Sequence, residues 1–181
     1  MYIALGIVGA VILFVIFLYN RLITLKNAVK NAWATIDTQL QRRFDLIPNL
    51  VETVKGYMTH EKDVLETVTK ARTAFMGADT VKGRAEAENM MAGALKSLFA
   101  VSENYPDLKA SQNFLMLQEE LAGTENKISY ARQRYNNSVM DYNIAIQKFP
   151  ANFIAGMFNF KPEDSFEVDD PEARKAVKVK F

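Results

Sequence analysis

The chain opens with an uninterrupted apolar run, and in the segments that follow, apolar residues recur every three or four positions. The run covers residues 1–19 and contains no charged side chain. At about 1.5 Å per residue, a helix of this length spans the roughly 30 Å hydrocarbon core of a bilayer. The run therefore predicts a transmembrane anchor whose apolar side chains include Ile3, Leu5, Ile7, Val11, Leu13, Phe14 and Phe17.

Two other interpretations of residues 1–19 fit the sequence less well. A cleaved signal peptide has a basic region before its apolar core and small residues at its cleavage site. Here no Lys or Arg precedes the apolar run, and Phe17, Leu18 and Tyr19 make a poor cleavage site. A core helix of a small soluble domain would carry a polar face, which this run lacks. We therefore expect a retained anchor.

The basic residues near the anchor predict its orientation. Arg21, Lys26 and Lys30 all follow the apolar run. Basic residues next to a span are enriched on the cytoplasmic side of the membrane. This bias predicts an N-terminus outside and a cytoplasmic C-terminal domain, with a periplasmic domain as the alternative.

The remaining pattern predicts four long helices. No glycine or proline occurs between Gly9 and Pro48, so the anchor can continue unbroken into the first of them. We expect this helix to end in a turn at residues 44–48, where Asp45 suits an N-cap and Pro48 suits the first turn of the next helix. The next helices are predicted over about residues 46–76, 84–104 and 111–149. The apolar stripe of the first is formed by Leu22, Leu25, Val29, Ala32, Ile36, Leu40 and Phe44.

The last of these helices has the most regular pattern. Large apolar residues recur every seven positions from Phe114 to Phe149, beside a row of mostly smaller residues. Heptad spacing indicates close packing against neighbouring helices. The sequence therefore predicts an all-α fold, in which the transmembrane helix is continuous with an antiparallel up-down-up-down four-helix bundle over residues 20–149. An even number of passes returns Phe149 to the membrane end. The large row is Phe114, Leu121, Ile128, Tyr135, Tyr142 and Phe149.

Two shorter segments follow the predicted bundle. Residues 150–160 are rich in aromatic side chains and contain no charge, but they are too few to span a bilayer. They either lie in the membrane interface or cap the open end of the bundle. Residues 161–181 are predicted to form a loosely ordered polar tail, with a short helical turn after Pro171. The candidate interface or capping residues are Phe149, Phe153, Ile154, Met157, Phe158 and Phe160.

Composition argues against several kinds of site. The chain has no cysteine, one histidine and a formal net charge of +1, which gives no basic footprint for nucleic acid. His60-Glu61 is not a zinc-protease motif, because Val64 stands where a second histidine is required. We therefore predict no catalytic, cofactor-binding or metal-binding residues. Polar residues beside the apolar stripes, such as Arg43 and Glu125, are expected to pair between helices or to form a contact surface.

Residue identities along most of the chain resemble the LemA family. The resemblance is carried by the stretch from Asn27 to Glu61, which includes Trp33, Arg42-Arg43 and Pro48-Asn49, and by later matches. It implies a bacterial single-pass protein of the cell (inner) membrane with an antiparallel helical bundle. It implies no known enzymatic activity and no catalytic residues, and some relatives are associated with magnetosomes. The later matches are Tyr105-Pro106, Leu117 to Leu121, Thr124 to Ile128, Ala131-Arg132, Tyr135-Asn136, Tyr142-Asn143, Phe149-Pro150 and Lys178-Val179.

These features predict a membrane-anchored, non-enzymatic scaffold or adaptor that presents helix faces for self-association or for protein partners that the sequence does not identify. Gly6 and Ala10 provide the small-xxx-small spacing found where membrane helices associate. The expected partners are the lipid bilayer and further copies of the chain. The alternative is a membrane-remodelling or signal-transducing protein that uses the Phe149–Phe160 segment at the lipid interface.

Overall fold

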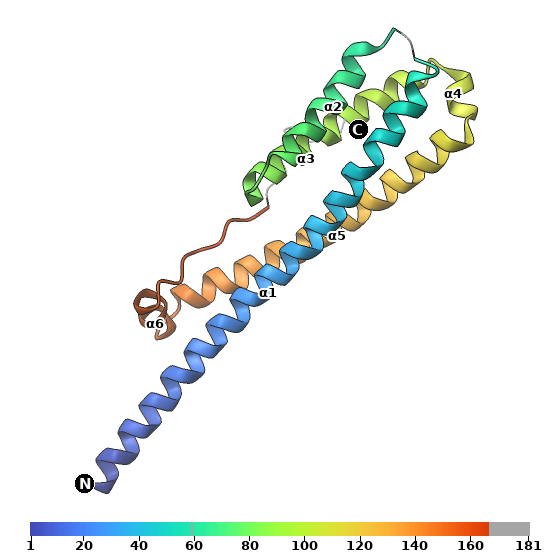
Figure 1. The fold of residues 1–181 in the computed structure, drawn as a ribbon. Coiled ribbons are helices and arrows are strands. Elements are labelled where there is room, and N and C mark those ends of the chain that lie inside the picture. The colour runs from blue at the N-terminus through green and yellow to red at the C-terminus, as the bar shows by residue number, and fades with distance from the viewer. Residues whose placement is uncertain (59, 167–181) are drawn as a thin grey trace, which may run out of the picture. The chain divides into compact units, whose positions relative to one another are not determined.

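The fold is known from a computed structural model that describes residues 1–58 and 60–166 (Figure 1). Every regular element in these residues is a helix, and they contain no strand. The all-α prediction is therefore confirmed, whereas the helical turn predicted after Pro171 lies outside the described residues. The helices are α1 (Tyr2–Lys55), α2 (Lys62–Met76), α3 (Val81–Ser102), α4 (Pro106–Ala110), α5 (Gln112–Gln147) and α6 (Ala151–Met157).

The turn predicted at residues 44–48 is wrong, because α1 continues through it and contains Pro48 in its interior. A proline inside a helix removes one backbone hydrogen bond and clashes with the preceding turn. Here the apolar stripe continues on the same face through Phe44, Ile47, Leu50 and Val54, all of which are buried. Burial of these side chains outweighs the local cost of the proline.

The first helix therefore ends later than the sequence predicts. The connection to α2 lies between Lys55 and Lys62, and α2 is correspondingly shorter than predicted. His60 lies in this connection and is exposed, instead of lying on the second helix. The other boundaries are within a few residues of the prediction. Thr80 caps α3 by accepting a hydrogen bond from the backbone N–H of Gly83, and Pro106 begins the short helix α4.

The chain divides into two compact units. Unit 1 consists of residues 1–38 and 129–165, and therefore contains the start of α1, the end of α5 and all of α6. Its core lies where buried residues of α1 and α5 meet. These residues are Leu22, Val29, Ala32 and Ile36 from α1, and Ala131, Tyr135, Val139, Tyr142 and Ile146 from α5.

Among the described residues, unit 2 consists of residues 39–128 together with Phe166. It contains the end of α1, the helices α2, α3 and α4, and the start of α5. The ring of Phe44 stacks on that of Phe75 with centroids 3.9 Å apart, and Phe99 meets Phe114 edge to face at 6.0 Å. These pairs join α1 to α2 and α3 to α5 through a common apolar interior.

The heptad row predicted on α5 is buried at five of its six positions, from Phe114 to Tyr142. Its last member, Phe149, is instead 80% exposed, because α5 ends at Gln147. The heptad pattern therefore identified the buried face of α5 correctly but extended it one turn too far.

Candidate functional site

The start of α1 has the exposure expected of a membrane span. It is the one helix in the described part of the chain that is long and apolar enough to cross a membrane, and 6% of the residues in its apolar window are buried. Each predicted anchor residue is at least half exposed: Ile3, Leu5, Ile7, Val11, Leu13, Phe14 and Phe17. Lipid is the solvent in which so much apolar surface on a single helix is stable.

Packing within unit 1 begins at the end of this apolar run, without a break in α1. Phe17 is 60% exposed, whereas Leu18 and Leu22 are already buried. The helix therefore changes within one turn from apolar on all sides to a single buried stripe.

The aromatic segment, residues 149–160, folds back onto this point of α1. The ring of Tyr19 contacts those of Phe158 and Phe160, with centroids 4.7 Å and 5.8 Å apart. The ammonium group of Lys26 lies 5.8 Å from the centroid of the Phe160 ring, within range of a cation–π interaction. These contacts place the end of the aromatic segment beside Tyr19, at the end of the apolar run, and beside Lys26.

The predicted interface or capping residues divide between the two faces of α6. Ile154 and its neighbour Ala155 are buried in unit 1. The opposite side is exposed and apolar, and the rings of Phe149 and Phe153 on it meet at 5.9 Å. One face of the segment thus packs on the protein, and the other remains open. The open residues are Phe149, Phe153, Met157 and Phe158, while Phe160 is intermediate.

A polar clamp on α5 holds the chain that follows α6. The hydroxyl of Tyr142 donates to the carbonyl of Lys161 at 2.9 Å, and that of Tyr135 donates to the carbonyl of Asp164 at 2.8 Å. Glu163 lies between these two carbonyls and is bound by Asn143. The Asn143 amide nitrogen donates to the Glu163 carbonyl, and the Glu163 backbone N–H donates to Asn143 Oδ1. The spacing fits, since seven helical residues rise about 10.5 Å and three extended residues cover about 10 Å.

The predicted loose tail is therefore wrong for its first residues, 161–166. The clamp fixes residues 161–164, and the side chain of Phe166 is buried. Sequence reasoning assigned the Tyr135 and Tyr142 rings to the core but could not foresee what their hydroxyls bind. The signal available was the tyrosine itself at two buried heptad positions, because a buried phenol requires a hydrogen-bond partner.

Burial also changes the acidity of the two tyrosines in the clamp. Burial, with a smaller contribution from the carboxylates of Glu163 and Asp164, raises the pKa of Tyr135 to about 12. The pKa of Tyr142 is raised for the same first reason, with Glu163 adding to the shift. Both phenols consequently stay protonated, and able to donate, over the whole physiological pH range.

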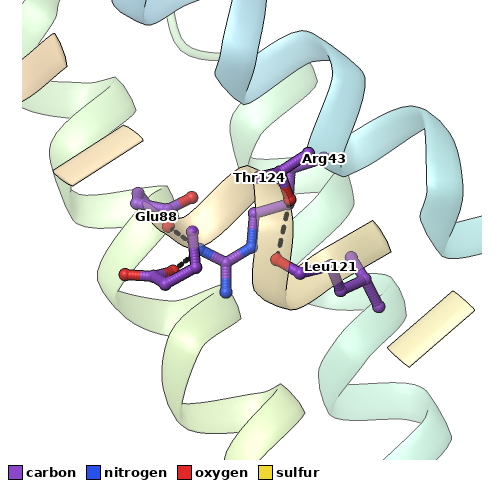
Figure 2. Close-up of polar contacts among 5 residues, drawn as sticks. Arg43, Glu88, Leu121 and Thr124 are labelled. Carbon is purple, nitrogen blue, oxygen red and sulfur yellow. Dashed lines mark hydrogen bonds and ion pairs between the residues drawn. The ribbon is translucent and has the colours of Figure 1, made fainter. Parts of the chain in front are cut away.

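Unit 2 contains a buried charge cluster that links three helices (Figure 2). The guanidinium of Arg43 on α1 pairs through Nη1 with Glu88 of α3 and Glu125 of α5. Arg43 and Glu88 are almost completely buried, whereas the side chain of Glu125 is 47% exposed. Nearby, the buried Thr124 hydroxyl donates to the carbonyl of Leu121 at 2.8 Å. The predicted pairing of polar residues between helices is thus realised for Arg43 and Glu125.

Glu88 was missed by sequence reasoning, although a signal was present. It lies three residues before the buried Met91, on the stripe that continues to Leu95 and Leu98, so it occupies a core position. A glutamate at a core position calls for a cationic partner. Beside the cluster, a cavity of about 340 Å³ opens between α3 and α5, with Arg43, Lys96 and Glu125 among its lining residues.

Other polar candidates from the sequence are dispersed. Arg42 forms an exposed pair with Glu120 at 3.8 Å, and Asp45 accepts a hydrogen bond from Gln41 instead of capping a helix. Residues 1–58 and 60–166 contain no group of three or more His, Cys, Asp or Glu side chains placed to hold a metal ion. The polar features that stand out are therefore the Arg43 cluster, which joins three helices, and the clamp, which joins α5 to residues 161–164.

Replacing Arg43 with methionine should lower the free energy of unfolding by about 3–5 kcal/mol, because it leaves the Glu88 carboxylate buried without its cation. Adding Glu88→Leu to Arg43→Met should recover much of the loss, since both buried charges are then gone. Denaturant titration of the full chain in detergent measures both effects. The matched control is Arg42→Met, which breaks an exposed pair and should cost less than about 1 kcal/mol. Equal losses for Arg42→Met and Arg43→Met would contradict the structural role of the cluster.

The clamp should weaken in alkali. The pKa of Tyr135 is about 12 in the folded chain against 10.0 when unperturbed, so folding favours the protonated phenol. Its contribution to stability should be complete below about pH 10 and decline as the pH rises towards 12. Thermal melting of the full chain at a series of pH values measures this decline. Tyr135→Phe should have a lower melting temperature at neutral pH, and this temperature should fall less as the pH is raised. If the melting temperatures of both proteins fall in parallel, Tyr135 is not the source of the decline.

Comparison with known proteins gives the chain a family. The LemA family matches residues 32–181, which includes the Arg43 cluster, the clamp and the aromatic segment. Protein LemA of Metamycoplasma hominis is 26% identical over 164 residues, covering 86% of this chain and 75% of that protein. Magnetosome protein MamQ 2 of Paramagnetospirillum magneticum is 25% identical over 175 residues, and magnetosome protein MamQ of Magnetospirillum gryphiswaldense 24% over 174. Each of these two alignments covers 82% of this chain and 64% of the relative. The sequence resemblance is thereby confirmed, and the chain belongs to the LemA family.

Proposed function

We propose that this protein is a membrane-anchored helical scaffold or adaptor, without enzymatic activity, that associates with further copies of itself. The observation that carries the proposal is the continuity of α1, which runs from Tyr2 to Lys55 without interruption. The apolar span and the first packed helix are one element, and Leu18 and Leu22 are buried immediately after the exposed Phe17. An anchor of this kind ties a folded helical surface directly to the bilayer, with no linker in between.

The buried polar groups support a structural role over a catalytic one. Arg43 is neutralised by Glu88 and Glu125, and the Tyr135 and Tyr142 hydroxyls are engaged by the backbone that they hold. Acid–base catalysis needs titratable groups that face a substrate at a suitable pKa. These groups are instead used to join helices and to fasten the chain.

Three exposed apolar side chains on one face of α5, which also carries Gln133 and Asn137, offer a surface for a second copy. In unit 1, Tyr130 is 72% exposed, Met140 53% and Ile144 41%. At 100° per residue, the three lie within about 80° of one another, on the side of α5 opposite the buried Tyr142. Each needs a partner outside its own unit to leave water.

The span favours another copy of the chain as that partner. Gly6 and Ala10 are four residues apart on an exposed helix, and a side chain at Gly6 would meet nothing within 4 Å. Small residues at this spacing let two membrane helices approach closely. An anchored chain already shares the plane of the bilayer with its copies, which raises their effective concentration.

We also infer that the helix segments of unit 2 form an antiparallel, up-down-up-down four-helix bundle. The stacked Phe44 and Phe75 rings and the pairing of Arg43 with Glu88 and Glu125 support this arrangement. Within unit 2, the ribbon reverses direction at each connection between the end of α1, α2, α3 and the start of α5 (Figure 1). Such a bundle would supply long helix faces for partners.

Self-association can be tested by disulfide crosslinking, because the chain has no native cysteine. Single variants Tyr130→Cys, Met140→Cys and Ile144→Cys should form disulfide-linked dimers on mild oxidation in native membranes, since their side chains face the second copy. Gel electrophoresis without reductant measures the dimers. The control is Asn31→Cys, at an exposed polar position of α1 in the same unit, which should give little dimer. A monomeric pattern at all three α5 positions would falsify the self-association proposal.

We propose that the folded domain is cytoplasmic, because Arg21, Lys26 and Lys30 follow the span. The Asn31→Cys variant reports this directly. In intact cells, a membrane-impermeant maleimide should fail to label it, whereas inside-out membrane vesicles should label it fully. Labelling in intact cells with the outer barrier permeabilised would instead establish a periplasmic domain.

A further inference from the structure

The apolar face of α6 is exposed although the other face of the same helix is packed. Ile154 and Ala155 are 6% and 3% exposed, whereas Phe153 and Met157 are 66% and 74% exposed. Phe149 extends the exposed face, and its ring meets that of Phe153. Packing within unit 1 is already provided by the buried face. The exposed stripe of Phe149, Phe153 and Met157 therefore requires an apolar environment that the unit itself does not supply.

The position of α6 along α1 identifies the environment. Phe158 and Phe160 contact Tyr19, the last residue of the apolar run, and Phe160 also lies near Lys26. Tyrosine at the end of a span and lysine just beyond it are the residue types found at the level of lipid headgroups. The α6 helix is thus fixed within unit 1 at the depth where the span leaves the hydrocarbon.

The composition of the segment matches that depth. Residues 149–160 contain no charge, while the residues on either side, Lys148 and Lys161, are both basic and exposed. Short apolar elements with basic flanks bind in the interface by burying aromatic rings among the acyl chains while their cations reach the headgroups. Seven helical residues are far too few to cross the bilayer.

We propose that the stripe formed by Phe149, Phe153 and Met157 inserts into the bilayer interface, giving the protein a second membrane contact beside its transmembrane span. The occupant of this face is lipid, because Phe158, the chain neighbour of Met157, contacts Tyr19 at the end of a span whose own apolar side chains are exposed. The contact would restrict tilting of unit 1 about the end of the span. This contact does not depend on the proposed self-association, which uses Tyr130, Met140 and Ile144 of α5.

The test places a reporter on each face in the full-length chain. Single variants Phe153→Cys and Met157→Cys are labelled with a polarity-sensitive fluorophore and reconstituted into vesicles of phosphatidylcholine and phosphatidylglycerol. Phe17→Cys in the span provides the lipid reference, and Asn31→Cys on the polar side of α1 provides the water reference. Lipids that carry a shallow quenching group should quench the labels at 153 and 157, as they quench the label at 17. A water-soluble quencher should reach only the label at 31.

Three results would overturn the proposal. If the labels at 153 and 157 are quenched from water like the label at 31, the stripe is exposed to solvent. If neither quencher reaches them, another protein surface covers the stripe, and a second copy is its occupant. If they are quenched only by lipids labelled deep in the bilayer, α6 does not lie at the interface.

A substitution separates lipid contact from packing. With the label at Met157→Cys, adding Phe153→Glu should lower the ratio of lipid-embedded to water-exposed label by about tenfold or more, because a carboxylate opposes insertion. The matched control Phe153→Leu stays apolar and should keep the label embedded. Both variants should melt at the temperature of the parent, since residue 153 contributes little to the core. A fall in melting temperature with no change in quenching would show that Phe153 packs on protein instead.

Discussion

The structure depends on α1, a single helix that combines an exposed apolar segment with a segment packed against the remainder of the chain. Up to Phe17 its apolar side chains are exposed, as is expected of a helix that spans hydrocarbon, and from Leu18 it carries a single buried stripe. The backbone hydrogen bonds stay inside the helix through this change, so no loop separates the exposed apolar segment from the packed one. The aromatic segment then packs against α1 at Tyr19, and the clamp on α5 holds the chain that follows it in the same unit.

Buried polar contacts fix the positions at which the apolar faces pack against one another. Apolar contact is non-directional, and helices with similar stripes can slide past one another at little cost. The Arg43 cluster removes that freedom in unit 2, because one guanidinium must meet carboxylates from α3 and α5 at the same time. In unit 1, the clamp does the same for residues 161–164, whose backbone is bonded at a fixed register along α5. Buried polar groups thus provide specificity, while burial of apolar area provides most of the stability.

The sequence was a good guide where one property repeated over many residues. It located the exposed apolar start of α1 and the buried face of α5 from Phe114 to Tyr142. It misled at Pro48, where a local helix-breaking signal was opposed by four buried residues on the same stripe. Glu88 and the clamp were missed because each depends on residues far apart in the chain. Arg43 and Glu88 are 45 residues apart, and Tyr135 and Asp164 are 29 apart.

The sequence by itself determined that the regular elements of residues 1–58 and 60–166 are helices, that the chain begins with a strongly apolar stretch, and which sides of α1 and α5 are buried. These follow from periodicity and composition, which are local properties of the chain. Only the tertiary structure decided that α1 passes through Pro48, that Arg43 meets Glu88 and Glu125, and that α6 buries one face while opening the other beside Tyr19. The physical reason is that each of these outcomes is set by contacts between segments far apart in the chain. Local preferences carry no information about such contacts and are too weak to override them.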